Sequence, residues 1–440
     1  MVAHLIHPDP PSKGEMPPIK KLFWAGIMLT SGTCTTLFAN TMFMQKAEGS
    51  AACTLEDDDT TCKFNKPWFS VLLMKLAMAM CLPLYYGVGW GKEDPSAPNP
   101  SWKTIKGVWL PSVLDLLNTI LGNVGLLWVS PSIYQMTRGS VVIFSALLSV
   151  KWLGRTLRSF HYWAILMVIV AVVLVGLAGI EATKDGDDDG SCGDDDDDGG
   201  DGGGGGGDDD DSGGAGNVIM GLLFIVAAQA VTAVQFITEE EFMNEFKATK
   251  LDPVALVGFE GLWGLVYFAV IAPIMTYTPP SDEAISIVWH EDFNDTFVQL
   301  SNSPTIVWLC VGYFVTILMY NVSANVVTKV LSAVVRSILE ACRTLGVWMV
   351  SLIFFYVGQK CIGEEWTNWS LLELFGFVVL IAGTFSYKAL IKLPCVSEAV
   401  YEQARDDDAQ FADEQQRRAQ EAESGRQRST DKYRFLPESV

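Results

Sequence analysis

The sequence predicts an all-α membrane protein with ten transmembrane helices arranged as two inverted five-helix repeats. Half of its 440 residues are hydrophobic, and its charged residues gather in connecting segments and at the ends of the chain. Apolar stretches of about 20 residues, the length that crosses a bilayer as a helix, recur throughout. Because backbone groups inside hydrocarbon must hydrogen-bond to one another, stretches of this length are expected to be helical.

Five candidate spans precede an Asp/Gly-rich segment, and five follow it. The first five are expected at residues 22–44, 67–90, 107–129, 132–153 and 160–180, and the second five at 218–237, 253–275, 304–326, 328–356 and 370–391. Only Ser130 and Pro131 separate the third span from the fourth, so that boundary depends on the proline. The eighth and ninth spans nearly touch at Val327.

The Asp/Gly-rich segment divides the chain into domains. It holds 14 Asp between Asp185 and Asp211, two thirds of the net charge of −21, and it has too little apolar surface to fold. The expected parts are an N-terminal segment 1–21, a first repeat 22–181, a lumenal loop 182–216, a second repeat 217–391 and a tail 392–440. An odd number of spans per repeat inverts the second relative to the first, a recurrent transporter design with the solute site between the repeats.

The distribution of Lys and Arg predicts that both termini are cytosolic, since basic residues favour cytosolic loops. The loops on that side carry Lys92, Lys103, Lys106, Arg155, Arg158, Lys247 and Lys250. The glycosylation sequons at Asn294 and Asn368 then fall on the opposite side. Cys53 and Cys62 lie in a loop on that opposite side too, and they are candidates for a disulfide.

The ninth span is the richest in ionisable residues, and a charge inside a span is costly enough to need a reason. Its polar residues recur at steps of three, four and seven, so they form one stripe of a helix: Lys329, Ser332, Arg336, Glu340 and Arg343. Glu340 can pair with Arg336 or with Arg343. The stripe is either the wall of a cavity for an anionic or zwitterionic solute or an ion-pair network that locks helices together, and it can be both.

The first repeat carries fewer charges inside its spans. Gln135 and Arg138 share a face of the fourth span, and Arg138 is the counterpart of Arg336, because each is an early arginine in the fourth span of its repeat. Arg138 either lines the cavity or extends to the lumenal interface. Asp115, which shares a face of the third span with Asn118, is expected to pair with Arg138 or with a lysine of the second span, or to take part in proton or cation coupling.

That lysine, Lys75, is expected to lie within reach of the membrane interface. In the second repeat, Gln229 lies on a polar face of the sixth span, and Glu260 lies in the middle of the seventh span among glycines that allow close helix packing. Glu260 is a candidate for the site or for a structural ion pair. Tyr320, near the end of the eighth span, is expected at the cytosolic mouth of the cavity.

No pattern for catalysis or for nucleic-acid binding is visible. The sequence has no G-x-S-x-G, H-E-x-x-H or Walker A motif, and none of its four His lies in a span. It has no basic face outside the tail, which argues against a nucleic-acid partner. The protein is therefore expected not to be an enzyme and to need no cofactor or metal.

Several segments resemble the drug/metabolite transporter superfamily. The stretch Gln135–Phe144, with the turn Leu153-Gly154-Arg155, is similar to the fourth span of that superfamily. The stretch Val327–Trp348 closely resembles the ninth span of the F subgroup of solute carrier family 35, sixth-member type. Shorter matches are Ala228-Gln229, Thr238-Glu239-Glu240 and Phe259–Leu262. The similarity extends from Asp115 to Ile391.

This resemblance implies an EamA-like, ten-span carrier with both termini in the cytosol, related to nucleotide-sugar carriers and to chloroquine-resistance-type vacuolar transporters. It also implies an endomembrane location, with the lysosome or vacuole favoured over the Golgi and the plasma membrane. The segment 182–216 and the tail depart from the family pattern.

The sequence thus favours a secondary transporter that moves a small polar or charged solute across a lipid bilayer by alternating access. Nucleotide sugars, amino acids or peptides, and organic cations all suit charges of both signs. The alternative is a non-transporting scaffold or receptor that acts through its cytosolic tail. There, Tyr433-Arg434-Phe435-Leu436 has the form that sorting adaptors bind.

Overall fold

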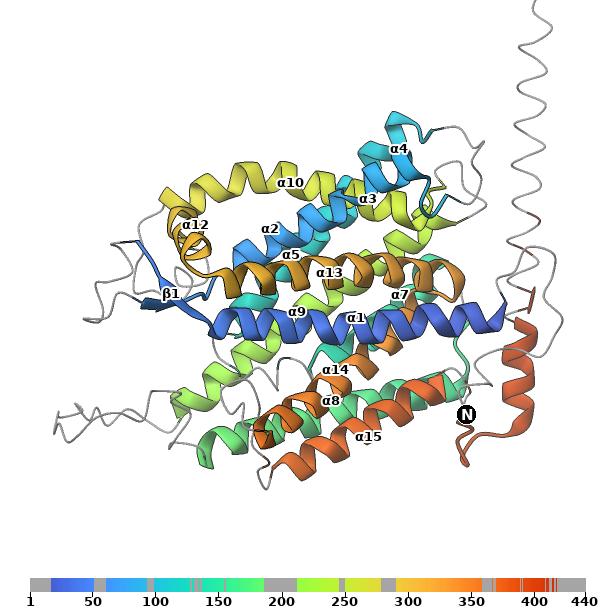
Figure 1. Cartoon of the computed structure of the whole chain (residues 1–440). Helices are drawn as coiled ribbons and strands as arrows, with labels where there is room; N and C mark the ends of the chain where they lie inside the picture. Colours follow the sequence, from blue (N-terminus) through green and yellow to red (C-terminus); the bar gives the residue numbers. More distant parts are fainter. Residues whose placement is uncertain are drawn as a thin grey trace, which may run out of the picture.

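The computed structural model is a bundle of long helices. The residues that it describes are 17–50, 61–92, 99–126, 137–153, 156–185, 212–244, 250–277, 290–357, 369–387 and 391–407, with a few single residues outside these ranges. Figure 1 shows the long helices running side by side, with α12 and the strand β1 at one end of the bundle and the start of α1 at the other. We call these ends the hairpin end and the tail end.

The first half of the chain begins with α1 (Pro18–Met44), the antiparallel strands β1 (Lys46–Glu48) and β2 (Thr61–Lys63), α2 (Pro67–Ala79), α3 (Cys81–Pro83) and a π-helical turn, Leu84–Val88. It continues with α4 (Trp102–Gly107), α5 (Trp109–Leu126), a 3-10 turn at Arg138–Ser140, α7 (Val141–Leu153) and α8 (Ser159–Asp185). The second half contains α9 (Ser212–Met243), α10 (Pro253–Tyr277), α12 (Phe293–Asn302), α13 (Pro304–Val330), α14 (Ala333–Tyr356) and α15 (Ser370–Tyr387).

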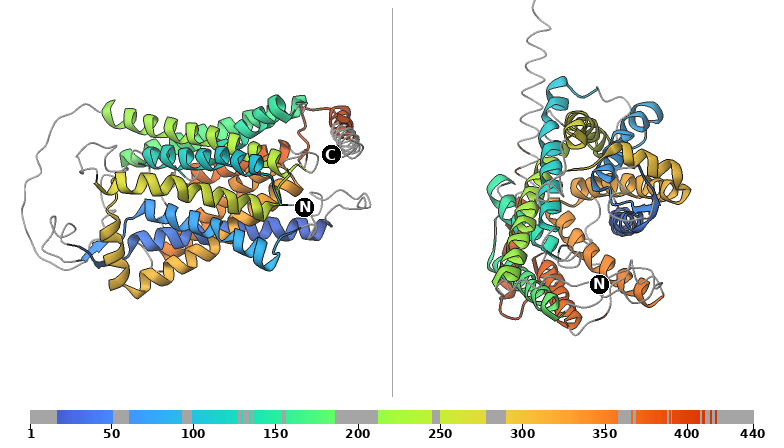
Figure 2. Two further views of the ribbon diagram at one scale, coloured as in Figure 1. Left: turned by 90° about the horizontal axis from the view of Figure 1, so that it is seen from above. Right: turned by 90° about the vertical axis from the view of Figure 1, so that its left-hand side faces the viewer.

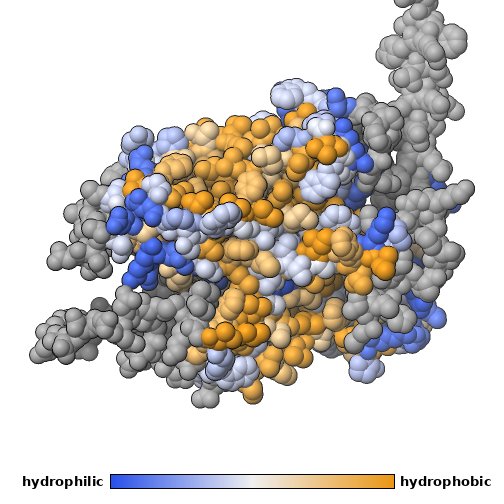
Figure 3. Space-filling view, viewed as in Figure 1, coloured by the Kyte–Doolittle hydropathy of each residue, from blue (hydrophilic) through white to orange (hydrophobic). Residues whose placement is uncertain are grey.

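Within the described residues, eight helices are long and apolar enough to cross a membrane: Ile19–Met44, Pro67–Val88, Ser159–Ala178, Ile219–Met243, Pro253–Tyr277, Pro304–Val330, Ala333–Tyr356 and Ser370–Tyr387. They match eight of the ten expected spans. The third expected span is α5, whose 18 residues include Asp115, Asn118 and Asn123, and the fourth contains α7 with 13 residues. Figure 3 shows a broad apolar region across the middle of the bundle, with hydrophilic residues toward both ends. The predicted class, an all-α membrane protein, is therefore confirmed. The short hairpin of β1 and β2 is the one departure from it in the described residues.

Prolines set where several of these helices begin or break. Pro67, Pro253 and Pro304 each occupy the first position of a helix, where a missing N–H costs nothing. Pro83 interrupts the second span, so α2 gives way to the short α3 and then to the π-helical turn.

Three expected boundaries are wrong in ways that matter for the site. The sixth span continues beyond residue 237 to Met243. The carboxylates in this extra part, Glu239 and Glu240, bond to residues of α14 inside the bundle. The eighth span extends to Val330, so Lys329 belongs to its last turn and not to the ninth span, and Tyr320 lies well inside it. In the fourth span the regular helix begins only at Val141, after the 3-10 turn.

The long helices pack in a regular set of pairs. α1 packs against α13 and α14, α5 against α9 and α10, and α7 against α9 and α14. α2 packs against α10 and α13, and α8 lies beside α15. Figure 2 shows the same bundle from above and from the hairpin end.

At the hairpin end, contacts connect parts of the chain that are far apart in the sequence. Both carboxylate oxygens of Glu291 accept hydrogen bonds from the first N–H groups of α2, at Trp68 (2.7 Å) and Phe69 (2.9 Å). Asp295 of α12 forms an ion pair with Lys66 at 2.7 Å and accepts the backbone N–H of Ser50 at 2.7 Å. These contacts tie α12 to the start of α2.

The two carboxyl groups of this end differ in their pKa. Burial raises the pKa of Glu291 to about 7, although its hydrogen bonds from Trp68 and Phe69 and the charge of Lys66 oppose the rise. Burial also raises the pKa of Asp295, but hydrogen bonds from Lys66 and Ser50 outweigh it and hold that pKa below its ordinary value.

The tail end joins the segment after α15 to the start of α8. Arg158 forms an ion pair with Asp407 at 2.7 Å. The ring of Tyr401, which is buried, lies 4.7 Å from that of Phe160. The first part of the expected tail therefore packs on the bundle.

Candidate functional site

The predicted polar stripe of α14 faces the interior of the bundle. Arg336, Glu340 and Arg343 are each at most 6% exposed, although an arginine or glutamate in a span is unfavourable unless it is paired. Their partners come from other helices, so α14 is the centre of the site.

Arg336 pairs with α9, not with Glu340 as one of the expected pairings had it. Its guanidinium forms a buried ion pair with Glu239. It also donates to Asn325 of α13 at 3.0 Å and lies 3.9 Å from the ring of Phe236. Gln235 donates to the other oxygen of Glu239 at 2.8 Å. Because α9 and α13 both bond to it, Arg336 links the two helices to α14.

Glu340 pairs with Arg343, the other expected partner. Their side chains meet at 3.0 and 3.1 Å, and the hydroxyl of Tyr320 on α13 donates to the second oxygen of Glu340. Arg343 also donates to the backbone oxygen of Gly32 in α1 at 3.3 Å. A Cβ at Gly32 would lie 2.5 Å from Arg343 Cδ, so only glycine leaves room for the arginine to reach this position.

Arg138 lies in the 3-10 turn that packs against α14. Its guanidinium is 5.8 Å from the ring of Tyr134 and within electrostatic range of Glu340 and Tyr320. Among the described residues it has no hydrogen bond and no ion pair. Within the described part of the chain, the guanidinium of Arg138 thus has Glu340 in electrostatic range but no ion pair of its own.

The fourth and ninth spans also meet between α7 and α14. The hydroxyls of Ser145 on α7 and Ser337 on α14 lie 2.7 Å apart and are both buried. The predicted correspondence of Arg138 and Arg336 thus places the two arginines on helices that touch one another.

The other predicted site residues lie around this centre. Lys75 pairs with Asp115 and is 1% exposed, so its expected position near the interface is wrong and one of the two pairings proposed for Asp115 is confirmed. Gln229 is buried on α9, Glu260 is buried on α10, and Asn118 is half-buried on α5.

Some predicted positions concern other features or lie outside the described residues. Gln135, Cys53, Asn368 and the segment Tyr433–Leu436 are not among the described residues. Cys62 is disulfide-bonded. Asn294 is exposed at the start of α12, at the hairpin end.

Sequence reasoning missed Glu239 as a site residue. The run Glu239-Glu240-Glu241 follows an apolar stretch and therefore looked like the start of a cytosolic loop. Glu240 accepts the N–H of Ala333 at 2.7 Å, at the start of α14. The signal was the arginine itself, because a buried guanidinium requires an acid partner.

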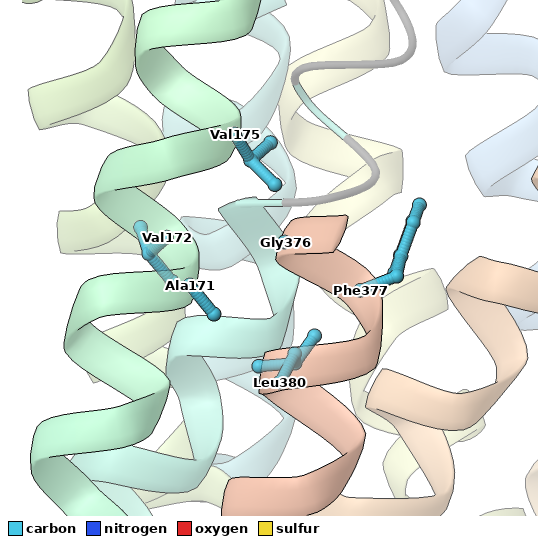
Figure 4. Close-up of a pocket in the computed structure, with 6 residues that line it drawn as sticks. All are labelled: Ala171, Val172, Val175, Gly376, Phe377 and Leu380. Carbon is cyan, nitrogen blue, oxygen red and sulfur yellow. The ribbon is translucent and has the colours of Figure 1, made fainter. Parts of the chain in front are cut away.

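Two further features bear on what the site can hold. The described residues contain no group of His, Cys, Asp and Glu that can hold a metal ion. An apolar crevice lies between α8 and α15, lined by Ala171, Val172, Val175, Gly376, Phe377 and Leu380 (Figure 4). Because every lining side chain is apolar, that crevice does not suit a charged solute.

Comparison with known proteins finds relatives that align with most of the chain. Solute carrier family 35 member F6 of Homo sapiens is 31% identical over 380 residues, which cover 84% of this chain and 89% of the relative. The protein of the same name from Rattus norvegicus is 30% identical over 385 residues, covering 86% and 91%. No protein-family model matches the chain. One crystal structure aligns with a TM-score of 0.39 at 12% identity, too low to support a shared fold.

The long apolar helices and these relatives together identify the protein as a membrane solute transporter. The relatives are named as solute carriers, which indicates a transporter rather than an enzyme. The chain belongs to the F subgroup of solute carrier family 35, as the sequence resemblance implied.

Proposed function

We propose that this protein moves a small anionic or zwitterionic solute across the membrane by alternating access between two inverted five-helix repeats. The observation that carries the proposal is the guanidinium of Arg138, which has no ion pair among the described residues and faces the Glu340–Arg343 pair. A guanidinium presents a planar fork of donors that suits a carboxylate or phosphate.

The charge balance of the site favours a negatively charged group on the solute. Among the described residues, the three arginines Arg138, Arg336 and Arg343 share two ion-paired carboxylates, Glu239 and Glu340. Each carboxylate is already neutralised by its own arginine. A bound anion would supply the missing negative charge at Arg138.

The packing of the helices supports the inverted repeat. If α1, α2, α5, α7 and α8 correspond in order to α9, α10, α13, α14 and α15, exchanging each helix for its counterpart turns four of the contacting pairs into four others. The pair α1–α13 becomes α9–α5, α1–α14 becomes α9–α7, α2–α13 becomes α10–α5, and α7–α8 becomes α14–α15; all eight pairs are in contact. The pairs α2–α10, α7–α14 and α8–α15 map onto themselves. Repeats related in this way are the architecture that carriers use for alternating access.

The position of the chain ends supports cytosolic termini. The start of α1 and the segment 391–407 lie at the tail end, together with Arg158. The disulfide-bonded Cys62 and Asn294 lie at the hairpin end. Disulfides and glycans form on the non-cytosolic side of membranes, so the hairpin end is the lumenal end in this proposal. The endomembrane location remains part of the same proposal.

Uptake by purified protein in proteoliposomes tests the function. A panel of radiolabelled nucleotide sugars, amino acids, dipeptides and organic cations is presented, and exchange against unlabelled solute is measured. We expect uptake of an anionic or zwitterionic solute, and we expect Arg138→Ala to reduce it at least tenfold, because Arg138 is free to bind the anion. Arg138→Lys should retain part of it, since the charge remains but the fork of donors is lost.

The matched control is Arg158→Ala, which removes an arginine at the tail end outside the site. It should leave uptake within about twofold of the unchanged protein. Uptake of organic cations alone, or anion uptake that survives Arg138→Ala in full, would contradict the proposed site.

A further inference from the structure

A second charged cluster lies where α2, α5 and α10 pack together. It consists of Lys75, Asp115 and Glu260. Lys75 and Asp115 form an ion pair, and the lysine side chain is buried. Glu260 is 2% exposed, and its Oε1 atom has no hydrogen-bond partner among the described residues.

The geometry brings all three side chains to one face of α10. Ser112 of α5 donates to the backbone oxygen of Glu260 at 2.9 Å, and Asp115 lies on the same face of α5 as Ser112. Gly264 lies one turn after Glu260, and a Cβ there would be 2.4 Å from Lys75 Cδ. The lysine stem therefore crosses the face of α10 that carries Glu260 on its way to Asp115.

The cluster has two carboxyl groups and one ammonium group. A buried carboxylate without a partner costs several kcal/mol, and such a group takes up a proton instead. Because Lys75 already pairs with Asp115, the cluster is neutral only when Glu260 carries a proton.

The other ionisable groups around the cluster do not supply the missing charge. Glu239 of α9 and Arg336 of α14 are within electrostatic range of Glu260 but neutralise each other. α13 brings Tyr313 near Asp115, and α3 brings Cys81 near the Val257 turn of α10. Both groups are neutral in their ordinary form at pH 7.

We propose that Glu260 is a proton-binding site and that its proton is the coupling ion of this carrier. The coupling role rests on the transport function proposed above. When the site opens to water, the O–H bond of Glu260 breaks and its proton passes to water. The carboxylate that remains accepts a hydrogen bond from the Lys75 ammonium, which is then shared with Asp115. Uptake of a proton from water on the other side of the membrane restores the first state.

Infrared difference spectroscopy of the full-length protein in lipid nanodiscs tests this site without any solute. A protonated carboxyl group gives a carbonyl band that a carboxylate lacks. All variants carry Glu291→Gln, because Glu291 also holds a proton near neutral pH. In this background we expect the band at neutral pH, and we expect its loss when Glu260→Gln is added. The control Glu398→Gln, which removes an exposed glutamate of the tail segment, should keep the band.

Two further variants separate a proton site from a merely structural glutamate. Asp115→Asn leaves Glu260 in place but frees Lys75 to pair with it, so the band should disappear. Lys75→Met removes the only ammonium of the cluster, so both carboxyl groups should be protonated and the band should grow about twofold. If Glu260→Gln does not fold, Asp115→Asn still tests the assignment.

A band that persists in Glu260→Gln, or that is unchanged in Asp115→Asn, would overturn the proposal. Loss of the band when sodium replaces choline at constant pH would overturn it too, since the site would then hold sodium. The two proposals fail separately. If the band behaves as expected but no solute is exchanged, the proton site stands without the transport function. If exchange depends on Arg138 but the band does not depend on Glu260, transport stands without this site.

Discussion

Arg336 and Glu239 neutralise each other at the centre of the bundle, although 97 residues separate them in the chain. Each of the two buried arginines of α14 has a carboxylate partner, and each partner is held by a second donor, Gln235 for Glu239 and Tyr320 for Glu340. At the scale of single residues, the two buried arginines of α14 therefore form two small neutral groups.

Replacing Arg336 by methionine should destabilise the protein by about 3–5 kcal/mol, because Glu239 would remain buried without a partner. The double change Arg336→Met with Glu239→Leu should recover most of this loss, since no charge is then left unpaired. The measurement is the unfolding midpoint in detergent.

The matched control is Arg158→Met, which breaks the more exposed pair with Asp407 and should leave the unfolding midpoint almost unchanged. A double variant no more stable than the single one would show that the pair does not act as a unit.

At the scale of elements, close approach of α10 to α2 depends on glycines. A Cβ at Gly261 would lie 2.3 Å from the backbone nitrogen of Ala79, and one at Gly258 would lie 2.7 Å from Leu82. Small residues at helix contacts are how membrane helices approach closely. This approach is also what brings Lys75 to the face of Glu260.

Gly261→Ala should therefore force the two helices apart and destabilise the protein by about 1–3 kcal/mol. Gly26→Ala in α1 is the matched control, because a Cβ there meets no atom within 4 Å. That change should be neutral or stabilising by up to about 1 kcal/mol, since alanine is the better helix former. Equal unfolding midpoints for the two variants would contradict the close packing of α10 and α2.

The hairpin end should respond to pH through Glu291. Its pKa rises from 4.5 to about 7 on folding, so the folded state holds the proton more tightly and the stability that this provides is lost as pH rises through 7. The loss amounts to roughly 3 kcal/mol at most. Asp295 has a lowered pKa and so loses its contribution only in more acidic solution, below its ordinary value of 3.8.

Hydrogen exchange of the amides of Trp68 and Phe69 measures this effect. Protection should be greater at about pH 5.5 than at about pH 7.5, after correction for the intrinsic exchange rate. Glu291→Gln, which stays neutral, should show little pH dependence between these values. Greater protection at the higher pH would mean that the carboxylate, and not the acid, is the preferred state at the start of α2.

At the scale of the whole molecule, the two ends of the bundle carry different groups of residues. The hairpin end carries Cys62 and Asn294, and the tail end carries Arg158 and Asp407. The apolar region lies between them (Figure 3). Because the two ends differ in this way, we expect the protein to insert into a bilayer in a single orientation, which the Lys and Arg residues of its loops determine.

A glycan on Asn294 would identify the hairpin end as lumenal. In eukaryotic cells, Asn294→Gln should abolish a glycosidase-sensitive mobility shift at this site. Asn321→Gln should leave the pattern unchanged, because Asn321 lies inside α13. An epitope at the C-terminus should be accessible when only the cytosolic side is exposed. An unglycosylated Asn294 together with an epitope protected in intact vesicles would reverse the orientation.

The sequence by itself determined the membrane class, most of the spans, and the polar stripe of α14. These features depend on local properties: the length of an apolar stretch, the spacing of polar residues along a helix, and the position of a proline. The stripe residues Arg336, Glu340 and Arg343 could be named because a charge in a span is conspicuous wherever the helix packs.

Only the tertiary structure decided which charges meet. Glu239 was hidden because it follows the apolar part of its helix and resembles the start of a loop, and Lys75 resembled an interfacial lysine. Whether such a side chain is buried depends on which faces of distant helices meet, and on glycines such as Gly261 that let them approach. Among the described residues, this packing creates the ion pairs of Arg336 with Glu239, Arg343 with Glu340 and Lys75 with Asp115. It leaves Arg138 and Glu260 without an ion pair there.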